Sequence, residues 1–452
     1  MSSLPVLNTM LNLKMAGNIA AASAPNTTEY RALVCLFFSG GMDSFNVLVP
    51  RSSAEYEEYK TVRGTLALAK NSLLPLTPTL SPGVDLGLHP ALANLKTLFD
   101  GGKAAFVSNV GTLLEPVTKT QFDDGGGRFP LGLFSHSDQV EQWQTGTSDI
   151  RSPRGWGGKA ADVLHSLNNT QTVSMNMSMS GGNVWQSGEE IFAYSIDPYQ
   201  GAVSLDGYDP SNDDASSITA IRTRAVDRQL ALDYQHLLTQ EFASRKRSAI
   251  DTYQLFNAAT DHDLPAGSNF NRDNNYLGAQ LERVAKAIAA HSALGHTRQT
   301  FYVEIGGWDM HSKLIAGQNE SLPPVSEAIL AFDNCMKALN LHNNVTTFTA
   351  SDFGRTLSSN GDGTDHAWGG NQFVFGGAVN GNHIYGQYPS LVEGGPLDVG
   401  RGRFIPSTPV DVYFAELALW LGVPKSELAT VLPNISGFYD PMSSSSPMGF
   451  LA

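Results

Sequence analysis

Acidic and imidazole side chains follow directly after several short apolar runs that have the character of buried β-strands. At the carboxyl ends of parallel strands, such groups meet at one edge of an open α/β sheet, where this architecture places its binding crevice. Carboxylates combined with neutral imidazoles form a ligand set suited to zinc or a similar divalent ion. The residues in this position are Asp43, Asp309, His311 and Asp352, and a glycine-rich loop adds Asp365 and His366.

The first of these groups is the segment 40–43 (GGMD), which follows the apolar run 33–38. Two glycines allow the backbone to turn sharply at the end of a strand, and the turn presents Asp43 at the sheet edge. Asp43 is therefore interpreted as a metal ligand or as the cap of the helix that follows. Asn46 is interpreted as a group that hydrogen-bonds substrate or as a turn residue.

The segment 306–311 (GGWDMH) repeats this arrangement after a second apolar run. Asp309 and His311 are two residues apart, so on an extended segment they project to the same side and can bind one ion together. The alternative is a solvated loop. We expect zinc, with calcium or manganese as alternatives, because an imidazole ligand favours a transition metal over an all-oxygen shell.

A third apolar run leads into Asp352 and Arg355. Asp352 is interpreted as a ligand. Arg355 is interpreted as a clamp for phosphate or sulfate oxygens, which a guanidinium matches bidentately, or as a partner in a surface ion pair. In the loop 361–370, His366 is a further candidate ligand. Asp362 is interpreted as structural, because Asp-Gly sequences are common turns.

The segment 135–138 (SHSD) supplies the candidate nucleophile. A serine hydroxyl at a helix N-terminus, beside a metal ion, can lose its proton and attack phosphorus or sulfur. Ser135 fits this role, but Ser135 and Asp138 also resemble a capping box. His136 is interpreted as a substrate-binding group, a ligand or only a neighbour of the site.

Strand-like and helix-like patterns alternate along the chain, which indicates an α/β fold with a mainly parallel central sheet flanked by helices. Residues at about 168–295 are interpreted as a mixed insertion within a single domain, 31–452. The segment 322–341 is predicted to be a helix with proline in its first turn. The sequence contains no G-x-S-x-G elbow and no dinucleotide or P-loop fingerprint, so those classes have no support.

The chain has 452 residues, with 29 Lys+Arg against 43 Asp+Glu and a formal net charge of -14. Such a surface repels nucleic acid and anionic membranes, so neither is an expected partner. No apolar run reaches the ~20 residues needed to span a bilayer. Cys35 and Cys335 are interpreted as small buried hydrophobes.

Residues 1–30 contain a mildly apolar stretch followed by Ala22-Ser23-Ala24, a small-x-small pattern of the kind that export signals carry at their cleavage site. The segment has little positive charge. It is therefore interpreted as the remnant of an export signal or as a flexible N-terminus. The first interpretation predicts a periplasmic or secreted protein.

Together, these motifs resemble the DUF1501 family, which is similar to the alkaline phosphatase and sulfatase superfamily. The matching segments lie within 31–166 and 296–390, and include FFSGGMDSFNVLVP, LFSHSDQVEQWQTG, TFYVEIGGWDMHS and VTTFTASDFGRT. The resemblance implies an alkaline phosphatase-like core, a metal-dependent ester hydrolase site and export by the twin-arginine route. By position, it implies one metal held by Asp43 and Asp352, a second held by Asp309, His311 and His366, and Ser135 as the nucleophile.

The sequence departs from the family pattern at several points. Family members often have glutamate at the position of Asp352. The Asp-x-His spacing at 309–311 is tighter than the Asp-x-x-x-His spacing of alkaline phosphatases. The twin-arginine pair is absent, and the absence of a Cys-x-Pro-x-Arg motif excludes a formylglycine sulfatase.

The sequence therefore predicts an exported, metal-dependent hydrolase of phosphate or sulfate esters, whose substrate is a small molecule or a carbohydrate. In this hypothesis Ser135 attacks the ester and Arg355 clamps the remaining oxygens. The alternative is a secreted binding or assembly protein on the same scaffold, since fold does not fix function. Both a monomer and an oligomer are compatible with the sequence.

Overall fold

One large sheet runs through the centre of the protein. The computed structural model describes residues 29–81 and 83–452, so the interpretation of 1–30 lies almost entirely outside the described residues. The strands of this sheet are β1 (Arg31–Phe38), β5 (Ala104–Gly111), β6 (Asn176–Ser178), β7 (Tyr194–Ser195), β8 (Arg298–Ile305), β9 (Val345–Ser351), β10 (Gly370–Gly376), β11 (Ile384–Tyr385) and β12 (Thr408–Pro409).

The strand order is β11-β5-β10-β9-β1-β8-β6-β7, with β12 also paired to β5. β1 lies at the centre and pairs in parallel with both β8 and β9. β10 pairs antiparallel with β5 and β9. The amino-terminal end of β10 therefore lies at the edge where its neighbours have their carboxyl ends. A second, smaller sheet holds β2 (Leu48–Pro50), β4 (Leu86–Leu88) and β3 (Leu74–Pro75).

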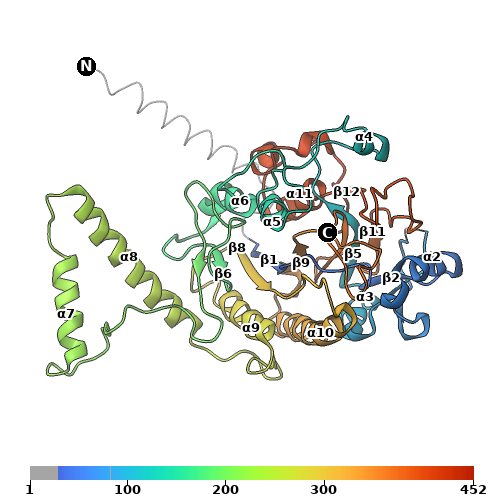
Figure 1. The fold of residues 1–452 in the computed structure, drawn as a ribbon. Helices are drawn as coiled ribbons and strands as arrows, with labels where there is room; N and C mark the ends of the chain where they lie inside the picture. The colour runs from blue at the N-terminus through green and yellow to red at the C-terminus, as the bar shows by residue number, and fades with distance from the viewer. Residues whose placement is uncertain (1–28, 82) are drawn as a thin grey trace, which may run out of the picture.

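Helices cover both faces of the large sheet (Figure 1). The helices on one face are α3 (Ala93–Asp100), α9 (Tyr276–Ala289) and α10 (Leu314–Ala338). Those on the other face are α5 (His136–Thr145), α6 (Trp156–Leu164) and α11 (Val410–Leu421). This arrangement confirms the predicted α/β class with a mostly parallel sheet flanked by helices. Among the described residues, no helix combines the length and the apolar character needed to cross a membrane.

Strand β1 shows why the sheet is buried on both faces. Val34 and Leu36 belong to the apolar core beneath α9 and α10, whereas Cys35 and Phe37 belong to the core beneath α6 and α11. Successive side chains of a strand point to opposite faces, so a continuous apolar run such as β1 suits a sheet covered on both sides.

Two further helices, α7 (Ile218–Leu230) and α8 (Leu237–Thr260), stand away from the body as an arm (Figure 1). Before them, β6 and β7 extend the large sheet beside β8. The other α-helices of the described residues are α2 (Ser53–Arg63), α4 (Lys119–Asp123) and α12 (Leu428–Val431).

Candidate metal centre

The candidate centre lies at the carboxyl edge of the three central strands. Asp352 follows β9 directly, and Asp309 follows β8 after a glycine turn. Because β10 runs in the opposite direction, the loop that precedes it reaches the same edge and contributes His366. The first residue of α5, His136, completes the group from the neighbouring helix.

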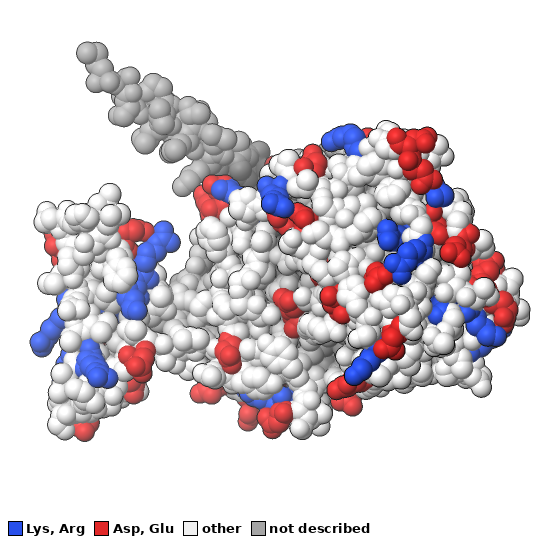
Figure 2. Space-filling view, viewed as in Figure 1, with Lys and Arg blue, Asp and Glu red and all other residues white. Residues whose placement is uncertain are grey.

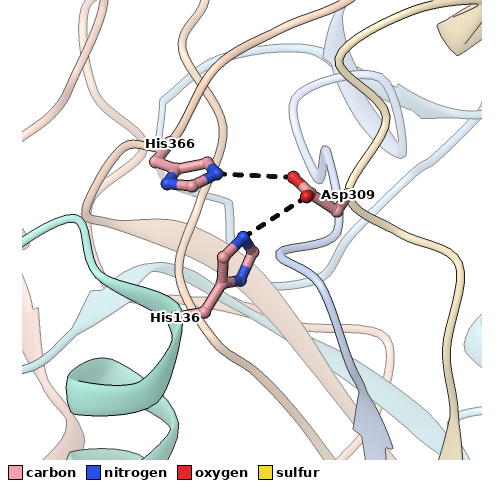
Figure 3. A group of neighbouring side chains, drawn as sticks. All are labelled: His136, Asp309 and His366. Atoms are coloured by element: carbon pink, nitrogen blue, oxygen red, sulfur yellow. Dashed lines mark ion pairs between the residues drawn. The ribbon is translucent and has the colours of Figure 1, made fainter.

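Three side chains from these elements converge (Figure 3). His136, Asp309 and His366 each offer a ligand atom, and the three atoms lie within 4.8 Å of one another. Nε2 of His136 is 3.4 Å from Oδ2 of Asp309. Nε2 of His366 is 3.4 Å from Oδ1 of the same carboxylate. Both imidazoles therefore direct the same type of nitrogen toward one carboxylate.

A third histidine joins the group from the loop after β8. Nε2 of His311 lies 3.0 Å from Oδ1 of Asp309. It also lies 3.0 Å from Nε2 of His366. Thus three imidazole nitrogens surround the Asp309 carboxylate.

Each of these imidazoles is held through its other nitrogen. Nδ1 of His136 lies 2.7 Å from Oδ2 of Asp352, and Nδ1 of His311 lies 2.9 Å from Oδ1 of Asp365. Nδ1 of His366 lies 2.9 Å from the backbone carbonyl oxygen of Phe134. All three partners are acceptors, so each Nδ1 carries a proton, and in its neutral form each ring presents an Nε2 lone pair to the centre.

Arg355 and two histidines favour an ionised Asp309 carboxylate, and burial favours the neutral form of His366. Burial alone would raise the pKa of Asp309, but the hydrogen bond and charge of Arg355, with His311 and His136, outweigh it and hold that pKa below its ordinary value. Burial lowers the pKa of His366, and the charges of His136 and Arg355 add to this effect. These are the protonation states in which the side chains can bind a cation.

Asp365 supports the group from the next position in the loop. Burial acts to raise the pKa of Asp365, but Asn360, His311 and Arg401 together lower it to about 2. Its Oδ2 lies 2.7 Å from Nη1 of Arg401. The sequence placed Asp365 in the candidate cluster but gave no sign of Arg401, whose loop is distant in sequence.

The turn after β1 approaches the centre through its backbone. The N–H of Gly40 donates to Oδ1 of Asp352 at 2.8 Å. Gly40 has a φ of +115°, and a Cβ atom there would lie 2.6 Å from the backbone nitrogen of Asp309. A side chain would therefore separate the turn from the loop after β8, which explains the glycine at this position.

Asp43 and Asn46 are buried behind that turn. Arg63 of α2 pairs with both carboxylate oxygens of Asp43, one of them at 2.7 Å, and Thr364 donates to it at 3.1 Å. Asn46 accepts from the hydroxyl of Tyr59 at 2.8 Å and donates to the backbone of Leu66. Among the described residues, no cluster of three or more ligand atoms includes Asp43. No sequence pattern indicated that Arg63 would pair with Asp43, because the fold brings the two residues together.

Arg355 is fully buried, and both terminal nitrogens of its guanidinium are already engaged, while its Nε has no partner among the described residues. It donates to Oδ1 of Asp309 at 2.6 Å, to the backbone oxygen of Gly40 at 3.3 Å and to that of Thr364. In this position Arg355 orients Asp309, and the Arg355 side chain is not exposed to solvent.

Ser135 lies at the N-cap position of α5, immediately before His136. Its hydroxyl makes no side-chain cap bond to the helix, and its Oγ lies 3.2 Å from Oγ of Ser137. Asp138 pairs with Arg151. The residue before Ser135, Phe134, has a φ of +72°, which turns its carbonyl toward His366.

Comparison with known proteins places this chain in a family. A sequence model of DUF1501, described as a protein of unknown function, matches residues 137–394. The match spans more than half of the chain, which therefore belongs to the DUF1501 family. No curated protein matches the sequence.

Two solved structures resemble the protein over most of its length. The crystal structure of Ps i-CgsB in complex with k-i-k-neocarrahexaose aligns with 91% of this chain and 78% of its own, at 10% identity and a TM-score of 0.34. The PsFucS1 sulfatase from Pseudoalteromonas sp. aligns with 90% of this chain and 71% of its own, at 11% identity and a TM-score of 0.36. Similarities at this level carry no argument about activity.

Proposed function

We propose that this protein is a metal-dependent hydrolase of phosphate or sulfate esters. The observation that supports the proposal is the approach of three imidazole Nε2 atoms to Asp309, with each Nδ1 already bonded to an acceptor. Two of these Nε2 atoms, from His311 and His366, lie only 3.0 Å apart. When both rings are neutral and carry their proton on Nδ1, a cation between these two nitrogens relieves the repulsion of their lone pairs.

The ligand atoms fit a zinc ion in size and type. Zinc binds imidazole nitrogen at about 2.0–2.1 Å in a tetrahedron, so neighbouring ligand atoms are expected about 3.3 Å apart. The contacts to Asp309 and between two of the histidines are 3.0–3.4 Å. His136, Asp309, His311 and His366 are the proposed ligands, with manganese or calcium as less suitable ions for a histidine-rich set.

The chemistry proposed for the site is attack on an ester of phosphorus or sulfur. A bound divalent ion would polarise an ester oxygen and stabilise the charge that develops during displacement. Ser135 remains the proposed nucleophile because it adjoins His136 at the start of α5. Asp309 is partly exposed, at 44%, which leaves the proposed centre open to a substrate. Export to the periplasm or medium is part of the same proposal.

Metal analysis and a substrate panel test this proposal. Purified protein loaded with zinc is expected to retain about one ion per chain after dialysis and to hydrolyse an aryl phosphate or aryl sulfate. His311→Ala and His366→Ala should lose both properties. His383→Ala, which removes a histidine bonded to the backbone of Asn380, is the matched control. A wild-type protein that binds no divalent ion would overturn the proposal.

A second function is favoured by the number of protein ligands. Four protein donors would be typical of a closed, structural zinc site if all four bound one ion. In that case the protein is a binding or assembly protein whose metal stabilises the loop edge. Zinc retained at full occupancy, no hydrolysis of any ester in the panel and a large loss of thermal stability on chelation would favour this second function.

A further inference from the structure

A tight hairpin at 398–404 lies beside the centre. Asp398 is buried, and its Oδ1 accepts the N–H groups of Gly400 and Gly402, both at 2.8 Å. Its Oδ2 accepts the N–H of Gly394 at 2.8 Å. A buried carboxylate with three backbone donors fixes the loop in one conformation.

This hairpin is joined to the two segments that carry the centre. Its Arg401 and Gly402 carbonyls accept the N–H groups of Ser358 and Leu357, in the segment that follows β9. The N–H of Gly369, just before β10, donates to the carbonyl of Phe404 at 3.0 Å. The hairpin therefore has a fixed position relative to the loop that carries His366.

Arg401, at the tip of the hairpin, is linked to the proposed ligand His311 through the carboxylate of Asp365. Nη1 of Arg401 contacts Oδ2 of Asp365 at 2.7 Å, while the other oxygen of Asp365 holds Nδ1 of His311 at 2.9 Å. The Arg401 side chain is 42% exposed. Its guanidinium is therefore anchored at one edge and open to solvent elsewhere.

Arg403 lies on the other side, above Phe134. Its guanidinium carbon is 5.0 Å from the centre of that ring. The carbonyl of Phe134 holds His366, and the next residue is Ser135. Nε of Arg403 is buried, and among the described residues it has no hydrogen-bond partner. Arg403 as a whole is only partly buried, so an anion at the surface can supply an acceptor for its guanidinium.

The charges also favour an anion. Three carboxylates at the centre, those of Asp309, Asp352 and Asp365, are matched by three guanidiniums. A divalent cation would then give the site a net charge of about +2, within a chain whose formal net charge is -14. The guanidiniums are those of Arg355, Arg401 and Arg403.

We propose that Arg401 and Arg403 bind a tetrahedral oxyanion, phosphate or sulfate, beside the metal centre. This proposal rests on the proposed function, and it gives these two residues the role that the sequence suggested for Arg355. Arg355 is buried and bonded to Asp309, whereas the Arg401 side chain is exposed and Arg403 is partly exposed. The ester and the free inorganic anion share this chemistry.

The test is calorimetric titration of zinc-loaded protein with inorganic sulfate and with inorganic phosphate. Arg401→Gln and Arg403→Gln are each expected to weaken binding about tenfold or more, because each removes a charged hydrogen-bond donor. Arg245→Gln is the matched control, since Arg245 is 82% exposed on α8 and pairs only with Glu241. Variants that bind both anions as tightly as the wild type would overturn the proposal.

Zinc content separates this proposal from the proposed function. Arg401→Gln and Arg403→Gln should keep the zinc content of the wild type, so that weaker anion binding is assigned to the lost guanidinium. If the zinc-loaded variants bind the anions as tightly as the wild type, Arg401 and Arg403 do not bind the oxyanion. The proposed metal centre is unaffected by that result. If the wild type holds no zinc, the proposed function is wrong. In that case the same titration on metal-free protein tests anion binding by Arg401 and Arg403. The variants are still expected to bind the anions more weakly than the wild type. Comparing the affinity for an aryl ester with that for the free anion in each variant shows which of the two Arg401 and Arg403 bind more tightly.

Discussion

Asp352 acts on the candidate centre through a histidine. One of its oxygens accepts the N–H of Gly40 and the other accepts Nδ1–H of His136. The carboxylate thereby fixes the tautomer of His136 and leaves Nε2 free to bind a cation. Such outer partners are common for metal-binding histidines and contribute to affinity. We therefore infer that Asp352 orients a ligand, whereas the sequence suggested direct ligation.

Replacing Asp352 should weaken zinc binding. In Asp352→Asn the Gly40 N–H keeps the amide oxygen, so the amide nitrogen faces Nδ1 of His136 and forces the proton onto Nε2. Zinc affinity, measured by competition with a chromogenic chelator, is expected to fall about 10- to 100-fold. Asp362→Asn is the control, because within the described residues the Asp362 carboxylate accepts the backbone N–H of Lys313 and no other hydrogen bond. Equal zinc affinity in Asp352→Asn and wild type would contradict this role.

Asp43 and Asp309 show how far a local pattern can predict a site. Both follow a strand and a pair of glycines, and the sequence gave both the same metal-binding interpretation. The fold separates them, because Arg63 of α2 reaches Asp43 while Asp309 faces three histidines. A buried carboxylate whose oxygens are bonded to a guanidinium is stable as an ion pair, and removing either partner is costly. No local signal distinguishes the two aspartates.

At the scale of elements, the parallel strands were predictable and the reversed one was not. Continuous apolar runs indicated β1, β8 and β9, because strands buried on both faces need them. The direction of β10 follows from its pairing with β5 and β9, which are distant in sequence. That reversal is what brings the loop before β10, and His366 with it, to the edge where the other ligands lie.

Helix α10 begins earlier than predicted. The sequence indicated a start near 322, because proline is favoured in the first turn and disfavoured inside a helix. In the structure the helix runs from Leu314 and contains Pro323 and Pro324. Gln318 is buried there and donates to the backbone of Asp43 at 2.9 Å. This tertiary contact and the burial of Leu314 stabilise turns that local propensity disfavours.

Helix α11 carries a buried carboxyl whose ionisation should destabilise the protein. Both oxygens of Asp411 are buried without a hydrogen-bond partner among the described residues, and burial raises the pKa of Asp411 to about 7. The ordinary aspartate pKa is about 3.9. Between these two pH values the unfolded state ionises first and is stabilised, so the free energy of unfolding should fall as pH rises, by on the order of 4 kcal/mol.

Asp411→Asn tests this effect. The variant is expected to be more stable than the wild type in urea at pH 8, and the difference should shrink toward zero below about pH 3, where Asp411 is largely protonated in both states. Asp233→Asn, at an exposed position, is the control for removing one acidic charge. A difference between Asp411→Asn and wild type that does not change with pH would exclude titration of Asp411 as the cause.

At the scale of the whole molecule, the body and the arm differ in how they are stabilised. On the face shown in Figure 2, acidic and basic side chains are interspersed and do not form an extended basic surface. The arm formed by α7 and α8 exposes large apolar side chains, namely Ile218, Ile221, Leu232, Leu237, Leu238 and Phe242.

The root of the arm is packed into the body, unlike its outer part. Phe256, in the last turns of α8, is buried in the main core and contacts the ring of Tyr194 at a centroid distance of 5.5 Å. Leu238 and Phe242, in the first turns of the same helix, are 73% and 67% exposed. The same helix therefore contains one residue type, phenylalanine, in two opposite environments.

Substitutions along α8 should show this difference in the free energy of unfolding. Phe256→Ala removes a buried ring and is expected to cost about 3–5 kcal/mol. Leu238→Ser and Phe242→Ser remove side chains that are already solvated, so each should change stability by less than about 0.5 kcal/mol. Urea unfolding of the three variants at equal protein concentration measures both effects. A loss of more than about 2 kcal/mol in Phe242→Ser would mean that this ring is buried in solution against another molecule, and the loss should then grow smaller as the protein is diluted, because dilution already removes that contact from the wild type.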